Sequence, residues 1–253
     1  MKTSLSLFLT MFLLPSLCIA QVTGIRELGL IQTDTGWEET FENLTGRSIA
    51  VLHVTFDCFQ DNGHHTQVDN DAIDPLYNFS ASPKPIQPGG SYSFKSNGHP
   101  QCSGGVNAVI FSDGRSEGDR EQIDRIYEQR RGVYKGLEFT IPLVAQIASG
   151  DLETQKAIAI LDRQLHSTAN DMSRSMVDRV GEAWPYEMML SVLRHQTSFR
   201  TPSDTLPNRE PRVEDLAKSN NIPKEQALAI IVLSKFKEWQ AALERHLDPL
   251  VGN

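Results

Sequence analysis

The sequence lacks the features that mark nucleic-acid-binding and membrane-spanning proteins. Its 24 lysines and arginines are outnumbered by 32 aspartates and glutamates, and no basic block is longer than Arg130-Arg131. This balance argues against nucleic acid or an anionic membrane as the main partner. No apolar run reaches the roughly 18 residues that a membrane-spanning helix needs. With 39% hydrophobic and 22% charged residues, the composition is that of a folded globular protein.

Motifs of the common enzyme classes are also missing. The chain has no Gly-x-Ser-x-Gly nucleophile elbow, no phosphate-binding loop and no dinucleotide-binding Gly-x-Gly-x-x-Gly. It has no Cys-x-x-Cys or His-Glu-x-x-His spacing for a metal either. The sequence therefore predicts no catalytic residue and no cofactor.

The first twenty residues have the pattern of a cleaved signal peptide. A positively charged start leads into an almost wholly apolar stretch from Leu5 to Leu14, which Pro15 ends, and Cys18-Ile19-Ala20 follows. We expect cleavage between Ala20 and Gln21 and a secreted or periplasmic protein with no integral membrane segment. The alternative is an uncleaved membrane anchor, which the short apolar stretch disfavours.

Cysteine is scarce, with three residues in the whole chain. Removal of the signal peptide takes away Cys18 and leaves Cys58 and Cys102 as an even pair. In an oxidising compartment such a pair predicts a disulfide bond, which would stabilise the chain by about 4 kcal/mol for a loop of this length. The alternatives are two buried thiols or a metal site.

The hydrophobic pattern changes near residue 116. Before it, apolar residues alternate in short runs between turn residues, as at 48–59 and 91–95, and 106–111 is a more uniformly apolar strand. In the first run we expect Ala50, Leu52, Val54, Phe56 and Cys58 on one buried face, and Ile49, Val51, His53, Thr55 and Asp57 on the other, polar face.

Three stretches, which overlap or precede these runs, resemble the strand entries of immunoglobulin-like sandwich domains in exported, mostly uncharacterised bacterial proteins. They are Phe41-Glu-Asn-Leu-Thr-Gly-Arg-Ser-Ile-Ala-Val, Ile86-Gln-Pro-Gly-Gly-Ser-Tyr-Ser-Phe and Val106-Asn-Ala-Val-Ile-Phe-Ser-Asp-Gly. The resemblance covers residues 41–114 and implies a β-sandwich without implying any site residue. Unlike the antibody core, the chain has no Trp between the two cysteines.

After residue 116 the apolar spacing is helical almost to the end. We expect one helix at about 123–141, interrupted by glycines and Pro142, and a second capped by Asp151. A third, with Met172, Met176, Val180 and Trp184 on one stripe, should stop at Pro185 and resume at a new angle. The last should begin at Pro223. Residues 201–211 contain three prolines and should connect helices.

These patterns predict an α+β fold. It consists of an N-terminal antiparallel, immunoglobulin-like β-sandwich at 21–115, after the signal peptide at 1–20, and a C-terminal α-helical region at 116–253. The charged stretch 119–131 should be a solvated, ion-paired helix face.

The leading functional prediction is an exported, non-catalytic binding or structural module. Such a module is compatible with a protein partner. The alternative is a metal-binding protein or metal-dependent enzyme that uses His64, His65 and neighbouring aspartates, although the stretch from Cys58 to Asp74 is better explained as a solvated loop. His53 and His99 are interpreted as surface or half-buried histidines. Asn43 and Asn78 match the glycosylation sequon, which matters only in a eukaryotic secretory pathway.

Overall fold

The computed structural model describes residues 22–34, 36–59, 65–74, 76, 84–97, 101–195 and 213–248, without the side chains of 30, 65–73, 96, 97, 101 and 102. Several predictions lie outside the described residues: the signal peptide with its cleavage site, the connector at 201–211, and the residues His64, Asn78 and His99.

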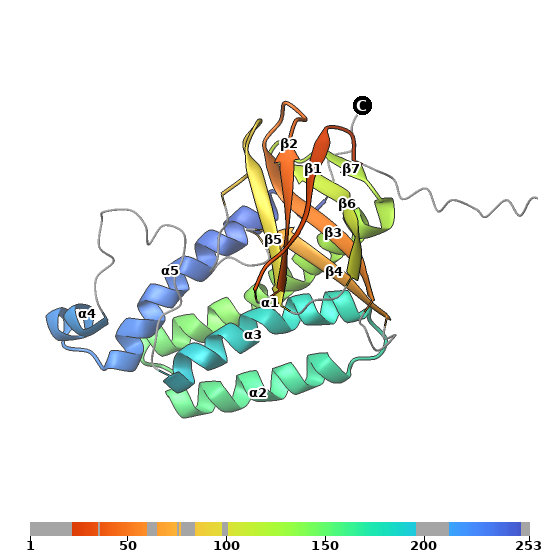
Figure 1. Ribbon diagram of the computed structural model, residues 1–253. Coiled ribbons are helices and arrows are strands. Elements are labelled where there is room, and N and C mark those ends of the chain that lie inside the picture. The colour runs from red at the N-terminus through yellow and green to blue at the C-terminus, as the bar shows by residue number, and fades with distance from the viewer. Residues whose placement is uncertain are drawn as a thin grey trace, which may run out of the picture.

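The described strands all precede the described helices and form two antiparallel sheets (Figure 1). One sheet has the order β1-β2-β5 and the other the order β4-β3-β6-β7. The strands are β1 (Ile25–Gln32), β2 (Gly36–Asn43), β3 (Ile49–Phe59), β4 (His65–Ile73), β5 (Ser91–Asn97), β6 (Gln101–Phe111) and β7 (Ser116–Gly118). The prediction of antiparallel strands followed by helices is confirmed.

The two sheets face each other across one apolar cluster. Its aromatic centre combines Trp37 of β2, Phe56 of β3 and Phe94 of β5, with the ring centroids of Trp37 and Phe56 4.8 Å apart and those of Phe56 and Phe94 5.5 Å apart. Edge and offset contacts of this kind add to the stabilisation from buried apolar area.

The prediction of one polar face on β3 is wrong. Leu52, Val54 and Phe56 do face the cluster between the sheets, but Val51 on the other face is also fully buried. The pairing with β6 shifts between Ile49 and Val51, which is why Ile49 joins the cluster between the sheets. His53, interpreted from the sequence as a surface or half-buried histidine, is only 4% exposed.

The interpretation of 58–74 as a solvated loop is also wrong over much of its length. Residues His65–Ile73 form β4, which pairs with β3 in antiparallel register. Asp74, just after this strand, is buried. The sequence of this stretch shows no alternation of apolar residues, so its pattern does not predict a strand.

The helices are α1 (Arg120–Ser149), α2 (Thr154–Asn170), α3 (Met176–His195), α4 (Val213–Asn220) and α5 (Lys224–Glu244). Pro142 and Pro185 lie inside α1 and α3, so the predicted interruptions at these residues are wrong. The cap of α2 is Glu153 and not Asp151, whereas Pro223 does precede α5 as predicted. Within the described residues, no helix is both long and apolar enough to span a membrane.

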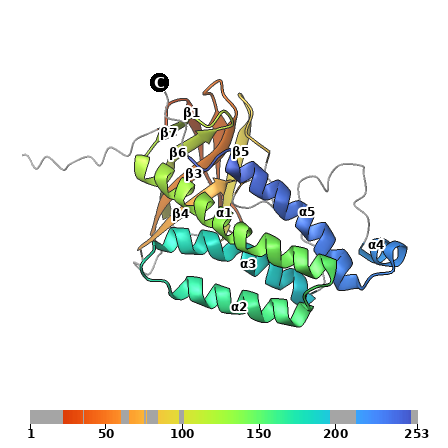
Figure 2. The same cartoon turned by 180° about the vertical axis from the view of Figure 1, so that it is seen from behind.

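Helix α1 belongs to two cores. Near its start, Ile123, Ile126 and Tyr127 pack on Val51 and Ile110, on the face of the second sheet that points away from the first. Further along, α1 packs with α2, α3 and α5 around a second, larger apolar cluster. Figure 2 shows α1 running from the sheets into the helices.

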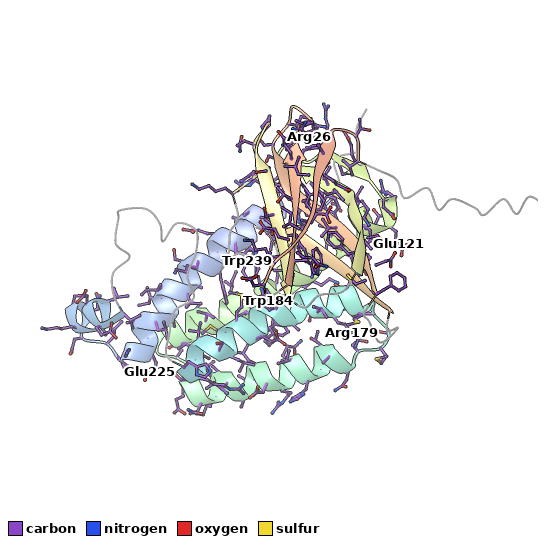
Figure 3. All side chains as sticks on the ribbon, viewed as in Figure 1. Arg26, Glu121, Arg179, Trp184, Glu225 and Trp239 are labelled. Atoms are coloured by element: carbon purple, nitrogen blue, oxygen red, sulfur yellow. The ribbon has the colours of Figure 1, made fainter. Side chains whose placement is uncertain are left out.

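The segment after β4 is tied to the helices by two polar contacts. Asp74 accepts hydrogen bonds from Arg130 of α1, and the backbone oxygen of Leu76 accepts one from Trp239 Nε1 at 2.6 Å. Trp239 lies where α5 passes the lower end of the sheets (Figure 3). Arg130 is therefore buried, at 2% exposure, and the prediction of a solvated face is wrong for this residue.

Candidate ligand-binding pocket

A cavity of about 250 Å³ lies where the second sheet meets α1 and the start of α3. Three elements that are distant in the sequence form its wall. The lining residues are His53 of β3, then Gln122, Arg125, Ile126 and Gln129 of α1, and Met176, Val177 and Val180 of α3. The lining thus combines a few polar groups with an apolar wall, which is usual for ligand sites.

His53 is held in one orientation by its neighbours on the sheet. Its Nδ1 atom lies 2.6 Å from Asn107 Oδ1, and Asn107 Nδ2 donates a hydrogen bond of 2.7 Å to Thr55 Oγ1. Because the amide nitrogen faces Thr55, the amide oxygen faces His53 and accepts a proton from Nδ1. The neutral imidazole in this arrangement carries its hydrogen on Nδ1.

The mouth of the cavity carries exposed apolar side chains. Met176 is 71% exposed and Val180 40%, and Met172, in the turn between α2 and α3, is 80% exposed. The sequence predicts one helix that carries all three residues, but α3 begins at Met176 and Met172 lies outside it. Exposed apolar residues grouped beside a cavity are typical of binding surfaces.

The wall formed by α1 and α3 is fixed by contact between the two backbones. A Cβ atom at Gly132 of α1 would collide with the backbone oxygen of Asp178, and one at Gly181 of α3 would collide with that of Gln129. Gln129 and Val180 both line the cavity, so this contact sets the distance between the two helices that form its wall. Gly132 and Gly136 were expected to interrupt α1, but both lie inside the helix, and Gly132 allows close packing on α3.

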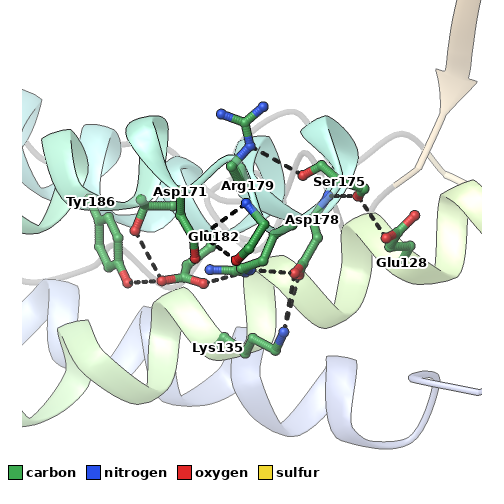
Figure 4. A network of polar contacts seen from close by, with 11 residues as sticks. Glu128, Lys135, Asp171, Ser175, Asp178, Arg179, Glu182 and Tyr186 are labelled. Atoms are coloured by element: carbon green, nitrogen blue, oxygen red, sulfur yellow. Dashed lines mark hydrogen bonds and ion pairs between the residues drawn. The ribbon is translucent and has the colours of Figure 1, made fainter.

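A network of charged side chains connects the same two helices (Figure 4). Asp178 of α3 accepts from Arg174 Nε at 2.7 Å and from Lys135 Nζ of α1 at 3.3 Å. Burial alone would raise the pKa of the Asp178 carboxyl, but the hydrogen bonds from Arg174 and Lys135 outweigh burial and lower that pKa. Asp178 is therefore ionised and bridges two helices at neutral pH.

Glu182, one turn further along α3, extends this network to α2. It lies 2.6 Å from Arg174 Nη2 and accepts hydrogen bonds from Thr168 Oγ1 at 3.1 Å and from the Tyr186 hydroxyl at 3.0 Å. Burial, followed by the Glu182 carboxylate, raises the pKa of Tyr186 above its usual value, so the phenol keeps its proton and donates it.

Ser175 caps α3 and anchors its first turn to α1. Its Oγ atom accepts from the backbone N–H of Asp178 at 3.0 Å and donates to Glu128 Oε1 at 2.7 Å. Sequence reasoning missed this cap, although Ser175-x-x-Asp178 before an apolar run is a recognisable helix start.

The predicted cysteine pair lies on neighbouring strands. The register of β3 and β6 sets Cys58 directly opposite Cys102. Residues opposite each other in an antiparallel pair have Cα atoms about 4.5–5.5 Å apart, within the range that a disulfide spans. The backbone therefore suits the predicted bond, which stays a prediction because the side chain of Cys102 is not described.

The alternative metal site is only partly covered by the structure. Asp69 and Asp71 are on β4, where backbone pairing sets Asp71 opposite His53, and Asp74 is engaged with Arg130. Among the described side chains, no group of three or more histidine, cysteine, aspartate or glutamate residues could hold a metal ion. The metal hypothesis for His64 and His65 stays untested.

Asn43 is a structural residue of the turn before β3. It is 1% exposed, and its Nδ2 atom donates to the backbone oxygens of Arg47 and Ile86 at 2.7 and 2.9 Å. Its Oδ1 atom accepts from the backbone N–H of Thr45 at 3.0 Å. The amide that a glycan would need is therefore occupied in the fold.

Comparison with known proteins gives no relative for this chain: no family model, no curated protein and no solved structure matches it.

Proposed function

We propose that this chain is an exported, non-catalytic binding protein and that the cavity between β3, α1 and α3 is its binding site. The observation that supports the proposal most directly is the lining, in which His53, Gln122 and Gln129 stand beside an apolar wall. Sites of this composition occur preferentially where separate layers of a protein meet.

The size of the cavity points to a small occupant. At about 250 Å³ it falls below the roughly 300–1,000 Å³ of sites for drug-sized ligands. A small molecule fits, and so does one side chain of a protein partner that rests on Met172 and Met176. None of the eight lining residues is a serine or cysteine that His53 could activate, which favours binding over nucleophilic catalysis.

We also propose that the sheets form an immunoglobulin-like sandwich. If β1, β2, β3, β4, β5, β6 and β7 are lettered A, B, C, C′, E, F and G, the two sheets have the orders A-B-E and C′-C-F-G, as in immunoglobulin-like domains. Two features depart from the antibody type. The cysteines lie on neighbouring strands of one sheet, and the buried Trp37 comes from β2. The fold agrees with binding but does not by itself specify it.

The test uses a variant that blocks the mouth of the cavity. Val180→Trp should fill the opening, and Ile230→Trp is the matched control because Ile230 is 39% exposed, as Val180 is 40%, and lies on α5 outside the cavity lining. A library of compounds with at most about a dozen non-hydrogen atoms is screened by amide chemical shifts.

We expect at least one compound to shift the amides of His53, Gln122 and Gln129 in the wild-type protein and in Ile230→Trp, but not in Val180→Trp. Compounds that bind Val180→Trp as well as they bind wild type, or no compound that shifts these amides, would show that this cavity is not the binding site.

A further inference from the structure

A carboxyl group lies between the two sheets, on β2. The side chains of Trp37, Glu39 and Phe41 alternate toward the interior, and Trp37 and Phe41 are part of the apolar cluster. Glu39 between them is only 6% exposed. An ionised carboxylate in such a position is unfavourable unless a cation or hydrogen-bond donors compensate for it.

A second carboxyl, that of Glu27 on β1, reaches across to the other sheet. A Cβ atom at Gly105 of β6 would collide with Glu27 Oε1, so the glycine leaves the space in which this carboxyl lies. Glu27 itself remains exposed to solvent. The start of β1 thus rests on the second sheet through a carboxyl group.

The cations of these strands lie on the outer face of the first sheet. Arg26 pairs with Glu42, and Lys95 of β5 pairs with Glu38 at 3.1 Å. Since neighbouring residues of a strand point to opposite faces, these pairs point away from Glu39.

Toward the interior, the titratable groups on the described side chains are few. They are Glu27 from β1 and Tyr92 from β5, while β3 presents Phe56 and the predicted disulfide residue Cys58, and β6 presents Gly104 and Gly105. Burial, and after it the charge of Glu27, raises the pKa of Glu39 to about 7, whereas burial raises that of Tyr92 above 10. The charge of Glu39 therefore changes near neutral pH.

β1 is the element that this charge would move. It is an edge strand that pairs with β2 alone. Its register shifts between Glu27 and Leu30, where Gly29 has a φ of 100°, so the ladder is interrupted next to the two carboxyls. Edge strands with few ladder bonds are the first parts of a sheet to open.

We propose that Glu27 and Glu39 form a proton-controlled latch for β1. With Glu39 protonated, the start of β1, which carries Glu27, stays closed on the second sheet at Gly105. With Glu39 ionised, two carboxylates that no cation faces among the described side chains repel each other, and β1 separates locally from β2 while the aromatic centre around Phe56 stays intact.

The test is amide hydrogen exchange of the full chain at pH 6 and pH 8, corrected for the intrinsic pH dependence of exchange. We expect the protection of β1 amides in the wild-type protein to fall about tenfold or more at pH 8, the change that one pKa unit of coupling gives. In Glu39→Gln the protection should be equal at both pH values. Glu42→Gln, on the outer face of the same strand, is the matched control and should keep the wild-type pH dependence.

A carboxyl titration by ¹³C NMR makes the test independent of whether Glu39→Gln folds. The midpoint of Glu39 should lie near 7 in the wild-type protein and lower in Glu27→Gln. An ordinary midpoint near 4.5, equal β1 protection at both pH values in wild type, or an unchanged pH dependence in Glu39→Gln would each overturn the latch.

Discussion

Arg130 and Asp74, 56 residues apart in the sequence, form a two-point ion pair in the interior. Nε of Arg130 lies 3.1 Å from Oδ2 of Asp74, and Nη2 lies 3.1 Å from Oδ1. The two side chains are 2% and 1% exposed. Since Asp74 follows the last residue of β4 and Arg130 belongs to α1, this pair connects the strands to the helices.

Removing one member of this pair should destabilise the protein strongly. We expect Asp74→Asn to lower the free energy of unfolding by about 3–5 kcal/mol, because it leaves the Arg130 charge buried without its partner. The double variant Asp74→Leu/Arg130→Met should recover most of the loss. Urea denaturation measures both. Asp124→Asn, which removes the exposed pair with Arg120, is the control, with a change within about 1 kcal/mol. A single variant no worse than this control would contradict the assignment.

Gly132→Ala should destabilise the protein, against the usual direction for a helix. In a helix interior, replacing glycine by alanine ordinarily stabilises by about 0.5–1 kcal/mol. Here the added methyl group would meet the backbone oxygen of Asp178, so α1 and α3 must separate. We expect a loss of about 1–3 kcal/mol, measured by thermal unfolding. A gain in stability would show that the two backbones are not in contact.

The disulfide and the signal peptide can be tested together by mass spectrometry of the secreted, non-reduced protein. We expect a chain that starts at Gln21 and a mass two hydrogens below that of the dithiol form. Removing the bond with Cys58→Ser/Cys102→Ser should cost about 4 kcal/mol in the chain-entropy model. Two cysteines that react with an alkylating reagent in the folded protein would reject the bond.

The network at Asp178 should give a stability change in acid. The folded-state pKa of Asp178 is lowered, so its contribution is complete above its unfolded pKa of about 4 and is lost as the pH falls through the lower folded value. We expect Asp178→Asn to be less stable than wild type by about 2 kcal/mol at pH 6. This difference should shrink steadily toward pH 3. Urea titrations at several pH values measure it, and a difference that is constant with pH would exclude an ionised Asp178.

The sequence predicts the parts of the fold in which local pattern and burial agree. The alternation at 91–95 corresponds to β5, the uniformly apolar run at 106–111 to β6, and the apolar stripe after Pro223 to α5. β1 and β2 were not recognised individually, because inward positions such as Glu27 and Glu39 are charged and break the alternation. The short α4 was missed as well, since none of its residues is buried.

The candidate site could not be predicted, because no local pattern describes it. His53, Gln129 and Val180 come from three segments, and only the tertiary structure brings them together. The same holds for Arg130, which has the sequence context of a solvated helix face and finds its partner in Asp74 of another segment. Met176 and Val180 have the spacing of a core stripe, yet they surround the mouth of a cavity.

The double role of α1 has a consequence for the order in which the chain is completed. A chain that ends at residue 118 would contain every described strand, yet Val51, Ala108 and Ile110 would face water because Ile123, Ile126 and Tyr127 had not been added. During synthesis the strands are therefore left with a bare apolar face until α1 follows, and α1 in turn needs α3 and α5 to cover its second half. The strands, which are synthesised first, therefore have a complete core only after the helices have been synthesised.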